Sequence, residues 1–231
     1  ETADGKHLIV ASHGEVLGLD KATGQVTGSR HMNFLITTDP IVIGTTLCLG
    51  ANDYYYGFFV DELGGQIWRT VSPKDEFVSQ PVVAGNTLML ASRNGKLWRV
   101  NADDGDWIWK DRKTNGEVTG GLAADKRAVY VPSMDHNFYA FDLATGSELW
   151  DTRLDGGSLD QTPLALNGQV LVPASGKGLY SVSSTDGVVK WEADGIEQLS
   201  AVDGDHVWAG DSAGSLKAIS LPSGEVVSST P

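Results

Sequence analysis

The sequence is poor in cysteine and in basic residues, and it has no long apolar run. Its one cysteine, Cys48, excludes an intramolecular disulfide, and its apolar neighbours predict a buried, unreactive thiol. Because no stretch of about 18 apolar residues occurs, no membrane span is predicted. Seventeen Lys and Arg residues against 30 Asp and Glu residues give a net charge of −13, which repels phosphate backbones and anionic membrane surfaces. Nucleic acid is therefore excluded as a partner.

The sequence also lacks the short motifs of common catalytic and metal sites. It contains no HxH or HExxH pattern and no phosphate loop. The histidines are scattered along the chain, at His7, His13, His31, His136 and His206. From these absences we predict no catalytic residue, no metal ligand and no cofactor.

Glycine, in contrast, is plentiful. There are 28 glycines, and charged residues make up only 20%, a composition typical of a turn-rich globular protein and not of disorder or a coiled coil. A chain of 231 residues can bury a core of ordinary size, so we expect one domain, residues 1–231.

A repeat of about 41 residues organises the chain. Four tryptophans lie 41 residues apart, and each ends a short segment that a glycine opens, four residues earlier: Trp68, Trp109, Trp150 and Trp191. Before each glycine, an alternating apolar stretch closes on a short polar residue, as at Asp142. Six such copies can be counted. The first and last copies differ, with Gly28 and Ser228 at the tryptophan position, as expected of terminal repeats.

Turn residues divide each copy into four short predicted strands. In the fifth copy, residues 161–166, 169–173, 178–183 and 187–191 are separated by turn residues such as Asn167 and Gly168, which suit tight hairpins. Four-stranded units of this kind cover their faces when they are repeated around an axis. The sequence therefore predicts an all-β fold, a β-propeller of about six four-stranded antiparallel blades. The competing fold is a linear β-solenoid, which has a shorter period and parallel strands.

The run Phe138-Tyr-Ala-Phe-Asp-Leu-Ala-Thr-Gly-Ser-Glu-Leu-Trp150, with strand openers at Gln80 and Gln161, resembles the PQQ-like β-propeller repeat of quinoproteins. The resemblance covers essentially the whole chain. It implies that the four tryptophans are structural, each indole docking on the next blade with its N–H bonded to backbone. The same repeat builds an outer-membrane assembly lipoprotein and sensor domains of bacterial receptors. With the polar start of the chain, this implies a periplasmic or secreted, bacterial-type protein.

The quinoprotein dehydrogenases of this family have eight blades, a quinone held over a cation in the central funnel, and in some members a vicinal cysteine pair. This chain has six copies and one cysteine, so none of those catalytic positions is carried over. The favoured hypothesis is a non-catalytic interaction or sensor module. The alternative is an enzyme, a small quinoprotein-type or sugar-acting propeller that uses the central funnel.

One copy departs from the others in a way that suggests a binding loop. Where the other copies have compact turns, the second has Asn52, Asp53, Tyr54, Tyr55 and Tyr56, which places three tyrosines at an expected hairpin tip. Tyrosine is enriched at recognition surfaces because it combines a large ring with a polar group. These five residues are the candidate interaction loop for a protein, peptide or glycan partner. The competing interpretation is that the rings fold back over the blade.

Overall fold

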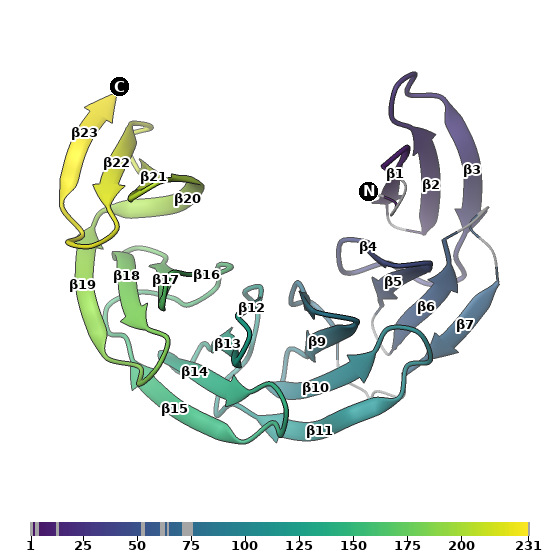
Figure 1. The fold of residues 1–231 in the computed structure, drawn as a ribbon, viewed down its shortest axis with the longest axis horizontal. Coiled ribbons are helices and arrows are strands. Elements are labelled where there is room, and N and C mark those ends of the chain that lie inside the picture. Colours follow the sequence, from purple (N-terminus) through teal and green to yellow (C-terminus); the bar gives the residue numbers. More distant parts are fainter. Residues whose placement is uncertain are drawn as a thin grey trace. The chain divides into compact units, whose positions relative to one another are not determined.

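The computed structural model describes residues 2, 5–12, 14–51, 54–60, 63, 65–70 and 76–230. These residues form strands and turns, and among them no helix is long and apolar enough to cross a membrane. The chain divides into two compact units, residues 1–113 and 114–231, and each holds three antiparallel sheets (Figure 1). The six sheets follow one another in sequence and confirm the predicted propeller blades.

The first unit contains a three-stranded sheet and two four-stranded sheets. The first sheet consists of β1 (His7–Ser12), β2 (Glu15–Asp20) and β3 (Val26–His31). The second consists of β4 (Ile41–Ile43), β5 (Thr46–Gly50), β6 (Tyr55–Phe59) and β7 (Gln66–Arg69). The third consists of β8 (Val82–Ala84), β9 (Thr87–Ala91), β10 (Lys96–Asn101) and β11 (Trp107–Lys113).

The second unit contains three four-stranded sheets. The fourth sheet consists of β12 (Ala123–Ala124), β13 (Ala128–Pro132), β14 (Asn137–Asp142) and β15 (Glu148–Arg153). The fifth consists of β16 (Leu164–Leu166), β17 (Gln169–Ala174), β18 (Gly178–Ser183) and β19 (Val189–Asp194). The sixth consists of β20 (Ile196–Asp203), β21 (His206–Asp211), β22 (Leu216–Ser220) and β23 (Val226–Thr230).

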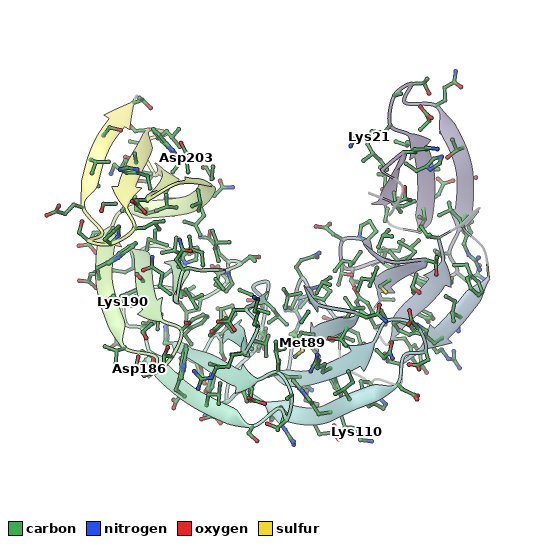
Figure 2. All side chains as sticks on the ribbon, in the orientation of Figure 1. Lys21, Met89, Lys110, Asp186, Lys190 and Asp203 are labelled. Carbon is green, nitrogen blue, oxygen red and sulfur yellow. The ribbon has the colours of Figure 1, made fainter. Side chains whose placement is uncertain are left out.

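The core of each unit lies between neighbouring sheets. Strand β5 is buried along its whole length, because successive side chains point to opposite faces and both faces are covered. Leu47 and Leu49 pack with residues of the first sheet, whereas Cys48 between them packs with residues of the third. Outer strands such as β11 and β15 carry several charged residues. Figure 2 shows Met89 of β9, which is buried, and Lys110 of β11, which points outward.

A recurring turn joins the third and fourth strands of a sheet, and it explains the spacing of Asp, Thr and Gly in the repeat. The carboxylate of Asp142 accepts hydrogen bonds from the backbone N–H and the hydroxyl of Thr145, at 2.8 and 2.9 Å. The amide of Gly146 donates to the Asp142 carbonyl, and this glycine has a φ of +69°. A residue without a Cβ is favoured at such an angle. The turn after β2, with Asp20 at its start, has the same bonds.

The innermost segments of neighbouring sheets are joined by hydrogen bonds between residues that lie about one repeat apart in the sequence. The Thr37 hydroxyl donates to the Phe77 carbonyl at 2.6 Å, and the Gln80 side-chain oxygen accepts from the Asp39 amide at 3.1 Å. Within the first unit, polar residues at the inner end of the second sheet are therefore bonded to the segment that leads into the third sheet.

Candidate interaction site

Three of the repeated tryptophans, Trp68, Trp150 and Trp191, lie on the outermost strands of their sheets and reach the following sheet. The indole N–H of Trp68, on β7, donates to the Ala102 carbonyl at 2.8 Å, and that of Trp191, on β19, donates to Leu221 at the same distance. Trp150, on β15, makes the corresponding bond to Ser184 at 3.4 Å. Each accepting carbonyl lies in the turn after the third strand of the next sheet.

The turn glycine of that next sheet lies directly under the ring. A Cβ added at Gly105 would be 2.7 Å from an atom of Trp68, and one at Gly224 would be 2.6 Å from Trp191. Both glycines also have positive φ, +74° and +76°. Two separate requirements therefore select glycine at this position, the backbone angle of the turn and the close approach of the indole.

The contact between the first and second sheets has no tryptophan and is built differently. In the second sheet, Trp68 of β7 pairs with Gly57 of β6. In the first sheet, Gly28 of β3 makes the equivalent pair with Gly18 of β2, so Gly28 occupies the position that tryptophan has in the second sheet. The side chain of Leu63 lies beside it, 3.8 Å from where a Cβ would be. Arg30, two residues further along β3, donates from its guanidinium to the Leu63 carbonyl at 3.0 Å and lies 4.8 Å over the Phe58 ring. Here an arginine supplies the hydrogen bond that tryptophan supplies elsewhere.

The structure corrects the expected position of the tyrosines at a hairpin tip. Tyr55 and Tyr56 belong to β6, where Tyr55 pairs with Gly50, and their exposed fractions are 0% and 8%. Tyr55 packs edge-on against Phe77 at 5.8 Å, facing the third sheet, because neighbouring residues of a strand point to opposite faces. Tyr54 is half-buried. The other two residues of the candidate loop, Asn52 and Asp53, lie outside the described residues.

The opposite face of β6 borders a cavity of about 380 Å³. Tyr56 stacks on Phe34 with ring centroids 4.3 Å apart and planes 5° apart, and on its other side approaches Phe58 at 5.9 Å. The lining includes these three rings and two arginines, Arg30 of β3 and Arg69 of β7. Of these residues the sequence indicated only Tyr56, because the lining comes from separate segments with members up to 39 positions apart.

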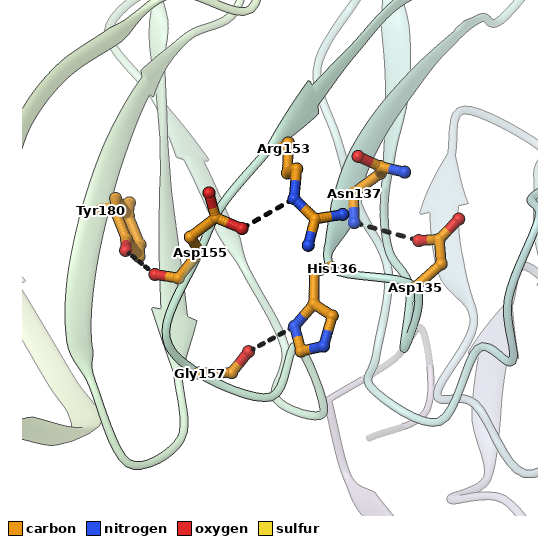
Figure 3. A network of polar contacts seen from close by, with 7 residues as sticks. All are labelled: Asp135, His136, Asn137, Arg153, Asp155, Gly157 and Tyr180. Atoms are coloured by element: carbon orange, nitrogen blue, oxygen red, sulfur yellow. Dashed lines mark hydrogen bonds and ion pairs between the residues drawn. The ribbon is translucent and has the colours of Figure 1, made fainter.

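Polar groups elsewhere form exposed networks. His136, in the turn between β13 and β14, has a φ of +68°, and its Nδ1 lies 3.0 Å from the Gly157 carbonyl (Figure 3). Since a carbonyl only accepts, Nδ1 carries the hydrogen. In the same region Arg153 pairs with Asp155 at 2.7 Å, and both side chains are largely exposed. Of these two contacts, the one between His136 and Gly157 joins neighbouring turns of the second unit.

Cys48 lies in the core as predicted. Burial, and to a smaller extent the negative charge of Asp103, raises the pKa of its thiol to about 12. In the part of the chain that the structure describes, no three His, Cys, Asp or Glu side chains come together in a group that could hold a metal ion.

Comparison with known proteins identifies the family. A family model described as outer membrane protein assembly factor BamB matches residues 14–119 and 111–231. No curated protein sequence matches significantly.

Among solved structures, BamB from Moraxella catarrhalis superposes with a TM-score of 0.81 at 17% identity, covering 98% of this chain and 73% of that one. The computationally designed Ika8 protein superposes with a TM-score of 0.82 at 17% identity, covering 97% and 71%. The family match, which extends over both units, confirms the PQQ-like repeat. The chain belongs to the family described as outer membrane protein assembly factor BamB.

Proposed function

We propose that this chain is an extracytoplasmic protein-docking module, a non-catalytic propeller that binds a protein of the bacterial envelope. The observation that carries the proposal is the family match over residues 14–231, because the family is described by an assembly factor and not by an enzyme. A protein partner is preferred to a glycan because the family description refers to the assembly of proteins. Fold alone does not assign a function, so the partner must be identified directly.

The structure offers a surface for such docking. The cavity beside Tyr56 is lined by aromatic rings and arginines, the residue types that dominate binding energy at protein interfaces. Tyr54 extends this surface, since its ring lies 4.8 Å beneath the Arg69 guanidinium. The aromatic character predicted for this stretch of sequence thus belongs to a concave site and not to a loop tip.

The proposal is tested in two steps with the whole chain. First, the tagged protein is expressed in its native host, the cells are fractionated, and complexes are stabilised with a cleavable cross-linker before purification. Second, each captured protein is produced pure, and its binding to the chain is measured by calorimetry, with heat-unfolded chain as the control. We expect the protein in the envelope fraction and one purified partner that binds with a defined stoichiometry. A cytosolic location, or no purified partner that binds the folded chain, would refute the proposal.

A further inference from the structure

A basic, aromatic cavity in an acidic protein suggests the chemistry of what it binds. The cavity lies in the first unit, between the end of β3 with the residues that follow it and the strands β6 and β7. Its volume of about 380 Å³ is at the lower end of the range of ligand pockets, roughly 300–1,000 Å³. This volume suits one or two side chains of an anchoring segment.

The apolar side of the cavity is a ladder of three rings. Phe34, Tyr56 and Phe58 follow one another, with centroid distances of 4.3 and 5.9 Å and interplanar angles of 5° and 20°. Tyr56 and Phe58 are buried in the first unit's core, with exposed fractions of 8% and 2%, so they hold the partly exposed ring of Phe34 in place. A preorganised surface of this kind accepts methylene groups or a ring from a ligand with little loss of conformational freedom.

The charged side of the cavity is formed by two arginines, each placed over a ring. The guanidinium of Arg30 lies 4.8 Å over Phe58, and that of Arg69 lies 4.8 Å over Tyr54. A guanidinium over the face of a ring is attracted by the ring's electrons, and the ring does not use up its N–H donors. None of the described residues that line the cavity is acidic. In a chain with a net charge of −13, this is a local concentration of positive charge.

A carboxylate fits this arrangement best. The guanidinium fork matches the two oxygens of a carboxylate, and charge-assisted bonds of this type are about twice as strong as neutral ones. The overall negative charge of the chain repels a polyanion more than a single carboxylate, and the ring ladder suits the apolar stem that joins a carboxylate to a peptide backbone.

We infer that this cavity binds an acidic peptide segment, with a Glu or Asp carboxylate bonded to Arg69 and Arg30 and an adjacent apolar side chain on the Phe34–Tyr56–Phe58 ladder. The inference rests on the proposed function, since it names the chemistry of the docking partner. Arg30 also bonds the Leu63 carbonyl, so Arg69, which is exposed on β7, is the residue whose change tests recognition without altering the contact between the sheets.

The test is fluorescence anisotropy with a labelled peptide, acetyl-Leu-Glu-Phe-Glu-Leu-amide, and its glutamine twin, on the intact chain. We expect saturable binding of the glutamate peptide and about tenfold weaker binding of the twin, the size expected for loss of one charge-assisted hydrogen bond. Arg69→Gln should weaken binding of the glutamate peptide by a similar factor. Arg69→Glu should reverse the preference, so that a lysine twin binds better than the glutamate peptide.

The matched control is Arg93→Gln, which makes the same charge change in the same unit at an exposed arginine paired with Glu76. It should leave binding unchanged. Far-UV circular dichroism and urea midpoints must show that all variants are folded. Equal binding of the glutamate and glutamine peptides, an unaltered Arg69→Gln variant, or an equal loss in Arg93→Gln would overturn the inference.

Two competitors distinguish the sources of the carboxylate. Unlabelled glutamate peptide should displace the labelled one, whereas free glutarate and inorganic phosphate should not do so at the same concentration. Displacement by either small anion would assign the cavity to a metabolite and overturn the peptide inference. The docking proposal and the cavity inference can be told apart. If a purified envelope partner binds Arg69→Gln as tightly as the unaltered chain, the docking proposal stands and the role of this cavity is refuted.

Discussion

The glycine beneath each docked indole should be far more sensitive to substitution than a glycine in the same turn without an indole. Gly105 and Gly24 allow this comparison inside the first unit. Both end the same type of turn, and their φ angles are +74° and +70°. An added Cβ at Gly105 would lie 2.7 Å from Trp68, whereas at Gly24 nothing lies within 4 Å. The two alanine substitutions therefore share the backbone strain and differ in the contact.

The expected costs follow from these two effects. Placing an L-residue at a left-handed φ costs about 1–2 kcal/mol, which is the whole effect for Gly24→Ala. Gly105→Ala must in addition push Trp68 from its site, and such overpacking costs about 1–3 kcal/mol. It also weakens the bond from the Trp68 indole to Ala102. We therefore expect Gly105→Ala to lower the free energy of unfolding by about 2–5 kcal/mol, which is a large part of the stability of an ordinary domain.

The measurement is urea unfolding followed by far-UV circular dichroism, with the free energy taken from midpoint and slope. A third variant, Trp68→Ala, removes the atoms that an alanine at position 105 would meet. In that background Gly105→Ala should cost no more than Gly24→Ala does, so the double-mutant cycle should give a coupling of about 1–3 kcal/mol. Equal costs for the two single glycine variants, or simple additivity of Gly105→Ala and Trp68→Ala, would refute the double requirement for glycine.

Three further substitutions or treatments test other contacts. Cys48, whose pKa burial raises to about 12, should resist a thiol reagent at pH 8 in the folded chain and react fully in urea; rapid labelling of folded protein would contradict its place in the core. Burial opposes ionisation of Asp125, but hydrogen bonds, first that from Tyr130 at 2.7 Å, outweigh it and lower its pKa below 3.8. Its stabilisation should therefore be complete above about pH 4 and disappear as the pH falls through the lowered value, and urea midpoints of Asp125→Asn should depend less on pH in that window. Gly28→Ala should raise stability by about 0.4–1 kcal/mol, because a Cβ there only touches Leu63 at 3.8 Å and the unfolded chain loses freedom; a lower melting temperature would count against the packing described.

The repeat made most of the fold predictable. Strand boundaries follow from turn residues, and the turn after β14 shows why: Asp142, Thr145 and Gly146 form bonds within five residues, so their spacing is visible in the sequence. The indole of Trp150 recurs at the same spacing because it docks on the next copy of that turn. Contacts within one repeat, or between one repeat and the next, recur along the chain and therefore give a periodic pattern in the sequence.

The candidate site was less predictable because it departs from the repeat. The stretch ending in Tyr56 lacks the compact turn of the other copies, which suggested a tip; the pairing of Gly50 with Tyr55, set by contacts across the sheet, placed the rings in β6 instead. Arg30 and Arg69 meet the same cavity only because β3 and β7 belong to adjacent sheets. No periodicity relates these two residues, so their proximity required the structure.

The same departure explains both the unusual contact between the first two sheets and the cavity beside it. Where the second, fourth and fifth sheets place an indole over the next turn, β3 has Gly28, and Leu63 with the Arg30 guanidinium forms the contact instead. An arginine in this role keeps the hydrogen bond to the neighbouring turn and brings a positive charge to the sheet boundary. An indole there would have supplied the bond without the charge. The group that joins the first repeat to its neighbour is therefore also a cation at the edge of the cavity, whereas an indole joins two sheets without adding charge.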